Sequence, residues 1–225
     1  MRTLCIDTSA ATALALVEDG KVLASGRAGS PRRHAEELST LTSALTEEMC
    51  ADSLKGLGVQ RICVGTGPGP FTGLRAGIAF ANALGLALDV PVLGLWSQEA
   101  LAASGLLEAN AEAVLALSDA RRGEVYWGIY KGKPRYPTVV VPPSVGPLAD
   151  ALKGAEEHGV STVVGPARVV KEVEGGVKVF PTDLRPELLA LLADSPGRTF
   201  GLEPLYLRRP DIQGQAEQEL PVPAR

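Results

Sequence analysis

The chain of 225 residues, 45% hydrophobic and 21% charged, has the composition of a globular protein and can form one large domain or two small ones. Its net charge of −4 gives no general attraction to nucleic acid, so any contact with RNA is expected to be local or to pass through a partner. The three cysteines are far apart and form no Cys-x-x-Cys pair, which argues against a zinc ribbon and is typical of a reduced, cytoplasmic protein. We expect neither a signal peptide nor a membrane span, because charged residues and prolines interrupt the apolar runs.

The chain opens with three predicted strands, at residues 3–6, 11–17 and 21–28. Asp19-Gly20 is a strong hairpin signal, so these strands are expected to form an antiparallel meander. The first strand ends in a carboxylate and two hydroxyls, at Asp7, Thr8 and Ser9. This group could contact phosphate or hold a metal-bound water. The alternative is a plain turn in which the aspartate bonds nearby backbone N–H groups.

After a turn at residues 30–33, a helix is predicted over residues 34–49. Leu38, Leu41 and Leu45 recur at spacings of three and four, which is the pattern of a narrow apolar stripe. Such a stripe indicates a helix that lies on a surface. His34 begins this helix beside two arginines and is expected at the surface.

Residues 61–102 form the most informative stretch. A short apolar run at 62–64, a Gly/Pro turn at 65–70, a long apolar helix at 72–88 and a second run at 92–95 predict a βαβ unit. The helix is apolar on nearly all sides, which favours burial in a core or against another chain. Residues of small size repeat every four positions along it, at Gly73, Gly77, Ala81 and Gly85. This stripe allows close approach of either another chain or the protein's own sheet.

The turn before this helix lacks the Lys-Ser/Thr of a P-loop and does not match Gly-x-Gly-x-x-Gly. A rigid turn is the favoured interpretation, although Gly69 could join Asp7, Thr8 and Ser9 in contacting a phosphate. Ser97 is expected to cap the following helix.

The second half repeats this organisation from about residues 105–110. Strands are predicted at 113–117, 124–130, 139–141 and 162–164, helices at 145–157 and 186–193, and an extended segment at 204–208. The tail from residue 210 is expected to be mobile. Four residues surround one hairpin at the junction of the halves and could bridge the lobes or form a salt-bridged turn: Asp119, Arg121, Glu124 and Tyr126.

The motifs GPGPFTGLRAG, with its following helix, and DARRGEVY, together with the opening LCIDTSAATALALVEDG, resemble the bacterial TsaB family of tRNA threonylcarbamoyladenosine biosynthesis. The resemblance covers Leu4 to about Asp211. It implies an α/β fold of two actin-like, ribonuclease H-like lobes with mixed sheets flanked by helices, the second lobe being reduced. The implied division is residues 1–104, 105–210 and a tail at 211–225.

The resemblance also implies a non-catalytic scaffold subunit that activates the catalytic TsaD subunit in threonylcarbamoyl transfer to the adenosine beside the anticodon. TsaD, a paralogue, carries a metal-binding His-x-x-x-His, whereas this chain has His34 but Leu38. We therefore expect no metal, no catalytic residue and no cofactor of its own; ATP or ADP would bind only within the assembled complex. The implied partners are TsaD, the ATPase subunit TsaE, a second copy when the chain is alone, and tRNA only through the complex.

The resemblance assigns partner contact to two helices, through Leu38, Leu41, Leu45, Gly73, Gly77, Ala81 and Gly85. A long side chain at Gly77 is accordingly expected to break association and leave the lobe folded. Two other classes stay open. One is a kinase-like ATP-dependent enzyme that uses Asp7 and Thr8, and the other is a glycoprotease-like hydrolase, although the chain has two histidines and no recognisable triad.

Overall fold

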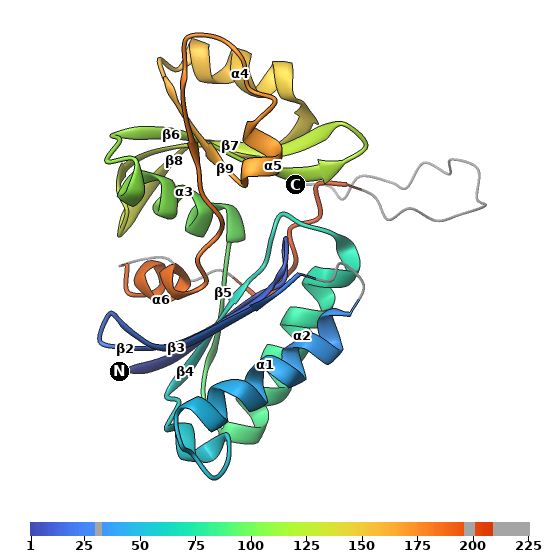
Figure 1. The fold of residues 1–225 in the computed structure, drawn as a ribbon, viewed down its shortest axis with the longest axis vertical. Helices are drawn as coiled ribbons and strands as arrows, with labels where there is room; N and C mark the ends of the chain where they lie inside the picture. Colours follow the sequence, from blue (N-terminus) through green and yellow to red (C-terminus); the bar gives the residue numbers. More distant parts are fainter. Residues whose placement is uncertain (30–32, 196–200, 209–225) are drawn as a thin grey trace, which may run out of the picture.

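The computed structural model describes residues 1–29, 33–195 and 201–208, and consists of two lobes stacked along its long axis (Figure 1). The predicted turn at residues 30–32 and the predicted mobile tail from residue 210 lie outside the described residues. Each lobe is built on one mixed five-stranded sheet. This confirms the predicted two-lobed α/β architecture.

The first sheet has the order β3-β2-β1-β4-β5. Its first three strands form the expected antiparallel meander, and β4 and β5 lie parallel to β1. The elements of this lobe are β1 (Arg2–Asp7), β2 (Thr12–Glu18), β3 (Lys21–Ala28), α1 (His34–Glu48), a short 3₁₀ turn (Lys55–Leu57), β4 (Arg61–Gly65), α2 (Phe71–Leu88) and β5 (Val92–Leu95).

The second sheet repeats this order as β8-β7-β6-β9-β10, with the same pattern of antiparallel and parallel pairs. The weak similarity between the two halves is therefore a true repeat of topology. The elements are β6 (Ala113–Arg121), β7 (Glu124–Lys133), β8 (Tyr136–Pro147), α4 (Leu148–Glu157), β9 (Thr162–Gly165), α5 (Ala167–Val170) and β10 (Lys178–Pro181).

One boundary in this lobe was predicted wrongly. Gly146 and Pro147 continue β8 by pairing with Val125 and Glu124, so α4 begins at Leu148 and not at residue 145. The sequence pattern also missed β10 and α5, which have four residues each and are too short to show a period.

Two helices lie between the sheets and join the lobes: α3 (Ser97–Glu108) and α6 (Glu187–Ala193) (Figure 1). Ten of the twelve residues of α3 are buried, because it packs on β6, β7 and β9 and also on α6. A single apolar cluster runs from Cys5 in the first sheet through α3 and α6 to Tyr130 in the second. The predicted division after residue 104 falls inside α3.

The small-residue stripe of α2 faces the protein's own first sheet. A Cβ at Gly73 or Gly77 would overlap Thr8, and one at Gly85 would overlap Val92. Ala81 is fully buried in the same core. The partner contact predicted for these four residues is therefore corrected: the backbone that approaches them belongs to this chain.

The leucines of α1 are placed in the same way. Leu38 and Leu45 are buried in the core of the first lobe, and half-buried Leu41 lies against Gly26 of β3. Leu38 and Leu45 are not available to a partner, which corrects the contact predicted for them, whereas a partner contact of the partly exposed Leu41 stays a prediction. The narrow stripe nevertheless predicted correctly that this helix lies on a surface, which is the face of the first sheet.

Within the described residues, α2 is the one helix whose length and composition would suffice to cross a membrane, and 39% of its residues are buried inside the protein. Core helices of soluble proteins share this length and composition.

We predict that Gly77→Ala destabilises the protein. Helix propensity alone would favour alanine by roughly 0.5–1 kcal/mol, but overlap with Thr8 is expected to cost about 1–3 kcal/mol. Urea denaturation would show whether the substitution lowers or raises the free energy of unfolding. Ala79→Gly on the exposed face of α2 is the matched control and should report propensity alone; a more stable Gly77→Ala would contradict the packing.

Candidate functional site

The turn after β1 is enclosed by the start of α2, the end of β4 and the start of α3. Asp7 is 1% exposed. One of its carboxylate oxygens, Oδ1, accepts hydrogen bonds from the Ser9 backbone N–H at 2.9 Å and the Ser9 hydroxyl at 2.7 Å. This is the turn geometry that the sequence left open as the alternative to a ligand site.

The second oxygen of Asp7, Oδ2, is buried without a hydrogen bond to the described residues. It lies beside Gly65 and Ser97, where a Cβ on Gly65 would overlap it. Burial raises the pKa of the Asp7 carboxyl, and the nearby Ser97 and Ser9 hydroxyls oppose that rise. The site therefore disfavours the charged carboxylate.

Ser97 was predicted to cap α3, and this is wrong. The helix is preceded by Trp96 and has no side-chain cap, while Ser97 lies in its first turn. Its hydroxyl instead accepts a hydrogen bond from the Gly67 N–H at 3.1 Å. Ser97 thus connects α3 to the loop that leads into α2.

Thr8 and Gly69 are occupied by contacts within the chain. The Thr8 hydroxyl donates to the Gly73 carbonyl at 2.7 Å, and a Cβ on Gly69 would lie 2.8 Å from the backbone of Ser9. The structure thus brings together Asp7, Thr8, Ser9 and Gly69. Their contact with phosphate stays a prediction.

The space between the lobes at this point is small. A cavity of about 20 Å³ is lined by Ser9, Ser97 and Arg27 on one side and by Ser118 and Pro166 of the second lobe on the other. A volume of this size holds about one water molecule. A nucleotide does not fit here unless the lobes move apart.

His34 is buried, with 8% of its surface exposed, which corrects the predicted surface position. The Thr12 hydroxyl donates to the Glu37 carboxylate at 2.6 Å and lies 2.9 Å from His34 Nδ1. Because a hydroxyl has one hydrogen, Nδ1 must be the donor in the second bond. Burial lowers the pKa of His34, while the charge of Glu37 acts in the opposite direction.

The position four residues after His34 offers no second ligand. Leu38 is fully buried in apolar surroundings. In the part of the chain that the structure describes, no three His, Cys, Asp or Glu residues are grouped so as to hold a metal ion.

The predicted junction group is brought together at the β6–β7 hairpin. Asp119 accepts the Arg121 N–H at 2.7 Å and lies 3.8 Å from Arg168, while Glu124 lies 3.1 Å from Arg208. Tyr126 is buried, and burial raises its pKa. The salt-bridged turn is thus present.

Arg208 is the residue that the sequence pattern did not single out. It donates to the Ala120 carbonyl at 2.7 Å, and three residues earlier the Leu205 N–H donates to Thr66 of the first lobe at 2.8 Å. The segment 204–208 therefore links the lobes. The motif Pro-Leu-Tyr-Leu-Arg-Arg was the available sequence signal, but nothing in it indicates a contact with a residue 88 positions away.

The two lobes repeat one sheet order, and an aspartate lies in the turn after the first strand. Together these features define an actin-like, ribonuclease H-like α/β protein. Residues 29–162 match the family described as TsaD, tRNA N6-adenosine threonylcarbamoyltransferase. The tRNA threonylcarbamoyladenosine biosynthesis protein TsaB of Bacillus subtilis is 33% identical over 159 residues, covering 70% of this chain and 67% of the relative.

An uncharacterised protein of Mycobacterium tuberculosis is 35% identical over 190 residues, covering 81% of this chain and 78% of its own length. The solved structure of YeaZ from Pseudomonas aeruginosa is 29% identical with a TM-score of 0.72, covering 92% of this chain and 99% of that one. The chain belongs to the TsaB family.

We predict that Asp7→Asn is at least as stable as the wild type at pH 7. The folded-state pKa of Asp7 is raised, so folding loses stability as the pH rises through it, and asparagine keeps the bonds to Ser9 without that charge. The difference should shrink as the pH falls. Asp7→Ala, which leaves a buried N–H unpaired, should lose about 1–3 kcal/mol. A marked loss for asparagine at pH 7 would mean that the negative charge itself is required.

We predict that the neutral His34 ring makes stability fall as the pH drops below 6.5. The folded-state pKa is lowered, so the unfolded chain binds a proton first. His34→Asn, whose amide N–H can replace Nδ1–H, should flatten this dependence in urea titrations at several pH values. His158→Asn, at the exposed end of α4, is the control. An unchanged slope in His34→Asn would contradict the assignment.

Proposed function

We propose that this chain is a non-catalytic scaffold subunit in the biosynthesis of threonylcarbamoyladenosine in tRNA, acting by binding the catalytic TsaD subunit. The TsaB relatives named for this pathway support the pathway itself. The ATPase subunit TsaE would join the same complex, and tRNA would be its substrate.

The observation that carries the scaffold role is the loss of the second imidazole. The family pattern of TsaD places His-x-x-x-His on the first long helix, and α1 has buried Leu38 in the second position. The remaining histidine is engaged by Thr12 through Nδ1. A Zn²⁺- or Fe²⁺-type site needs three or four such donors, which these residues do not supply.

The exposed surfaces of α1 and α2 provide the proposed docking face. The two helices lie side by side on the outer side of the first sheet (Figure 1). On α2 the outward residues include the small or apolar Ala79, Ala83 and Leu86, the last of which is 86% exposed, together with the polar Arg75 and Asn82. On α1 the outward residues include Ala35, Ser39 and Ser43.

Small side chains on two adjacent helices allow two further helices to approach closely, as in a four-helix bundle. This face replaces the buried stripe as the contact surface. In the proposed complex it receives the helices of TsaD, and a second copy of this chain would occupy it when TsaD is absent.

An omission assay tests the role. TsaD, TsaE, unmodified tRNA and threonylcarbamoyl-adenylate are combined with and without this chain. Modification that depends on the chain, with no turnover by the chain alone, is the expected result. Equal modification without it would overturn the proposal, and ATP hydrolysis by the purified chain would favour a kinase-like enzyme.

We predict that Ala83→Arg abolishes association with TsaD at micromolar concentrations and leaves the thermal unfolding temperature nearly unchanged. The new side chain would stand at the centre of the docking face, on a position exposed in the single chain. Size-exclusion chromatography would measure the association. Ala149→Arg, the same change on exposed α4, is the control and should associate normally. A normal complex for Ala83→Arg would refute this face.

A further inference from the structure

The edge where the lobes meet carries several arginines, although the chain as a whole is acidic. They come from separate elements. Arg33 precedes α1, Arg75 is in the first turns of α2, Arg121 is at the tip of the β6–β7 hairpin, Arg168 is in α5, and Arg208 is in the segment that links the lobes. We call these five residues the arginine edge.

Ion pairs and hydrogen bonds connect four of these arginines into one surface. Arg168 lies 3.8 Å from the Asp119 carboxylate, which also accepts the Arg121 N–H. Arg208 donates to the Arg121 carbonyl at 3.3 Å. Two residues before Arg208, the Tyr206 hydroxyl accepts a hydrogen bond from Arg75 at 3.0 Å.

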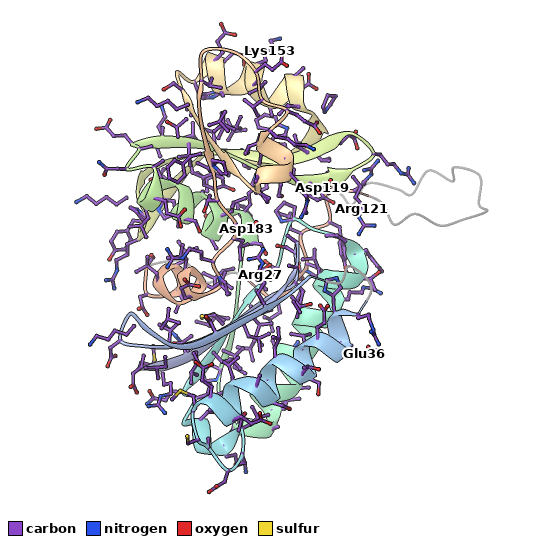
Figure 2. All side chains as sticks on the ribbon, viewed as in Figure 1. Arg27, Glu36, Asp119, Arg121, Lys153 and Asp183 are labelled. Atoms are coloured by element: carbon purple, nitrogen blue, oxygen red, sulfur yellow. The ribbon has the colours of Figure 1, made fainter. Side chains whose placement is uncertain are left out.

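The hairpin also faces the start of α1. The charge of Arg121 acts on His34, the residue after Arg33, and Figure 2 shows Asp119 and Arg121 on the part of the second lobe nearest the first. Arg121, Arg122 and Gly123 all have positive φ, at 64°, 54° and 77°. This tight turn holds both exposed arginines at its tip.

Carboxylates neutralise part of the arginine edge. Arg33 pairs with Glu36 at 2.7 Å, Arg168 with Asp119 at 3.8 Å, and Arg208 with Glu124 at 3.1 Å. Exposed pairs of this kind are weak and can exchange partners. Within the described residues Arg75 and Arg121 pair with no carboxylate, so the edge keeps a positive charge.

Aromatic rings accompany this charge. The Phe71 and Tyr206 rings stack with centroids 4.7 Å apart, and the Arg75 guanidinium lies 4.0 Å from the Phe71 centroid. None of the three is fully buried. Guanidiniums beside partly exposed aromatic rings are the combination that binds the backbone and unpaired bases of RNA.

We propose that the arginine edge contacts the phosphate backbone of tRNA directly. This inference rests on the proposed function, which makes tRNA the substrate of the complex. The guanidiniums project from five segments and do not converge on one pocket, which suits a row of phosphates better than a single small anion. An acidic segment of a protein partner is the competing occupant.

The test uses the complex of this chain with TsaD and an unmodified tRNA transcript. The double variant Arg121→Glu/Arg168→Glu should still assemble, because both positions lie on the second lobe and neither belongs to the docking face. Its affinity for the transcript should fall about tenfold or more, and the slope of log affinity against log salt should flatten by about 0.7–0.9 for each lost phosphate contact.

Lys153→Glu is the charge-reversal control and matches one of the two replacements in charge. Lys153 is exposed on α4, at the far end of the second lobe from Arg121 (Figure 2), and its reversal should leave binding unchanged. Arg121→Gln, a milder change, should show a smaller loss in the same direction.

Three results would overturn the proposal. They are an unchanged affinity and slope for the double variant, an equal loss of affinity for Lys153→Glu, and, when TsaE is added, a loss of TsaE association by the double variant while its RNA binding stays intact. Failure of wild-type assembly with TsaD is a different outcome and would refute the proposed function. In that case the same transcript and variants are measured with the chain alone, where an unchanged affinity again overturns the RNA contact.

Discussion

The close contact between the backbone of α2 and the turn after β1 is the constraint on which the first lobe depends. Glycine at two successive turns of the helix lets it approach Thr8, whose hydroxyl donates to the Gly73 carbonyl at 2.7 Å. Each glycine costs helix stability, and the contact offsets that cost. The contact also fixes the rotation of α2. It places the glycines inside and turns Ala79, Ala83 and Leu86 outward, where the proposed partner would bind.

The same constraint explains the state of the turn itself. In ATP-using proteins of this fold the phosphates would need space beside Asp7. Here Gly69 packs on Ser9, the Ser97 hydroxyl accepts from the Gly67 N–H, and the cavity lined by Ser9 and Ser97 has a volume of only about 20 Å³. The carboxylate is buried, which raises its pKa. A turn that disfavours a charged carboxylate and leaves little room fits the proposed role of a subunit that supports chemistry elsewhere.

Local patterns predicted most of the fold. Asp19-Gly20 identified the first hairpin, and the Gly/Pro turn with its apolar helix identified the βαβ unit. The contact partner of the small-residue stripe of α2 was harder to predict. Small residues indicate that another backbone comes close, but they do not indicate whether it belongs to the same chain or to a partner. His34 was misplaced because Thr12, its partner, comes from a strand 22 residues away. The contacts of Arg208 span up to 88 residues, a separation at which no periodicity gives information.

The apolar cluster that runs through α3 and α6 has a consequence for folding. Helix α3 buries ten of its twelve residues between the two sheets, so neither sheet can complete its core without the other. The halves repeat one topology, yet they are not interchangeable modules that could be cut apart and folded separately. The chain should unfold in one cooperative transition. A partner that binds the first lobe is therefore connected to the second lobe through the packing of α3 and α6.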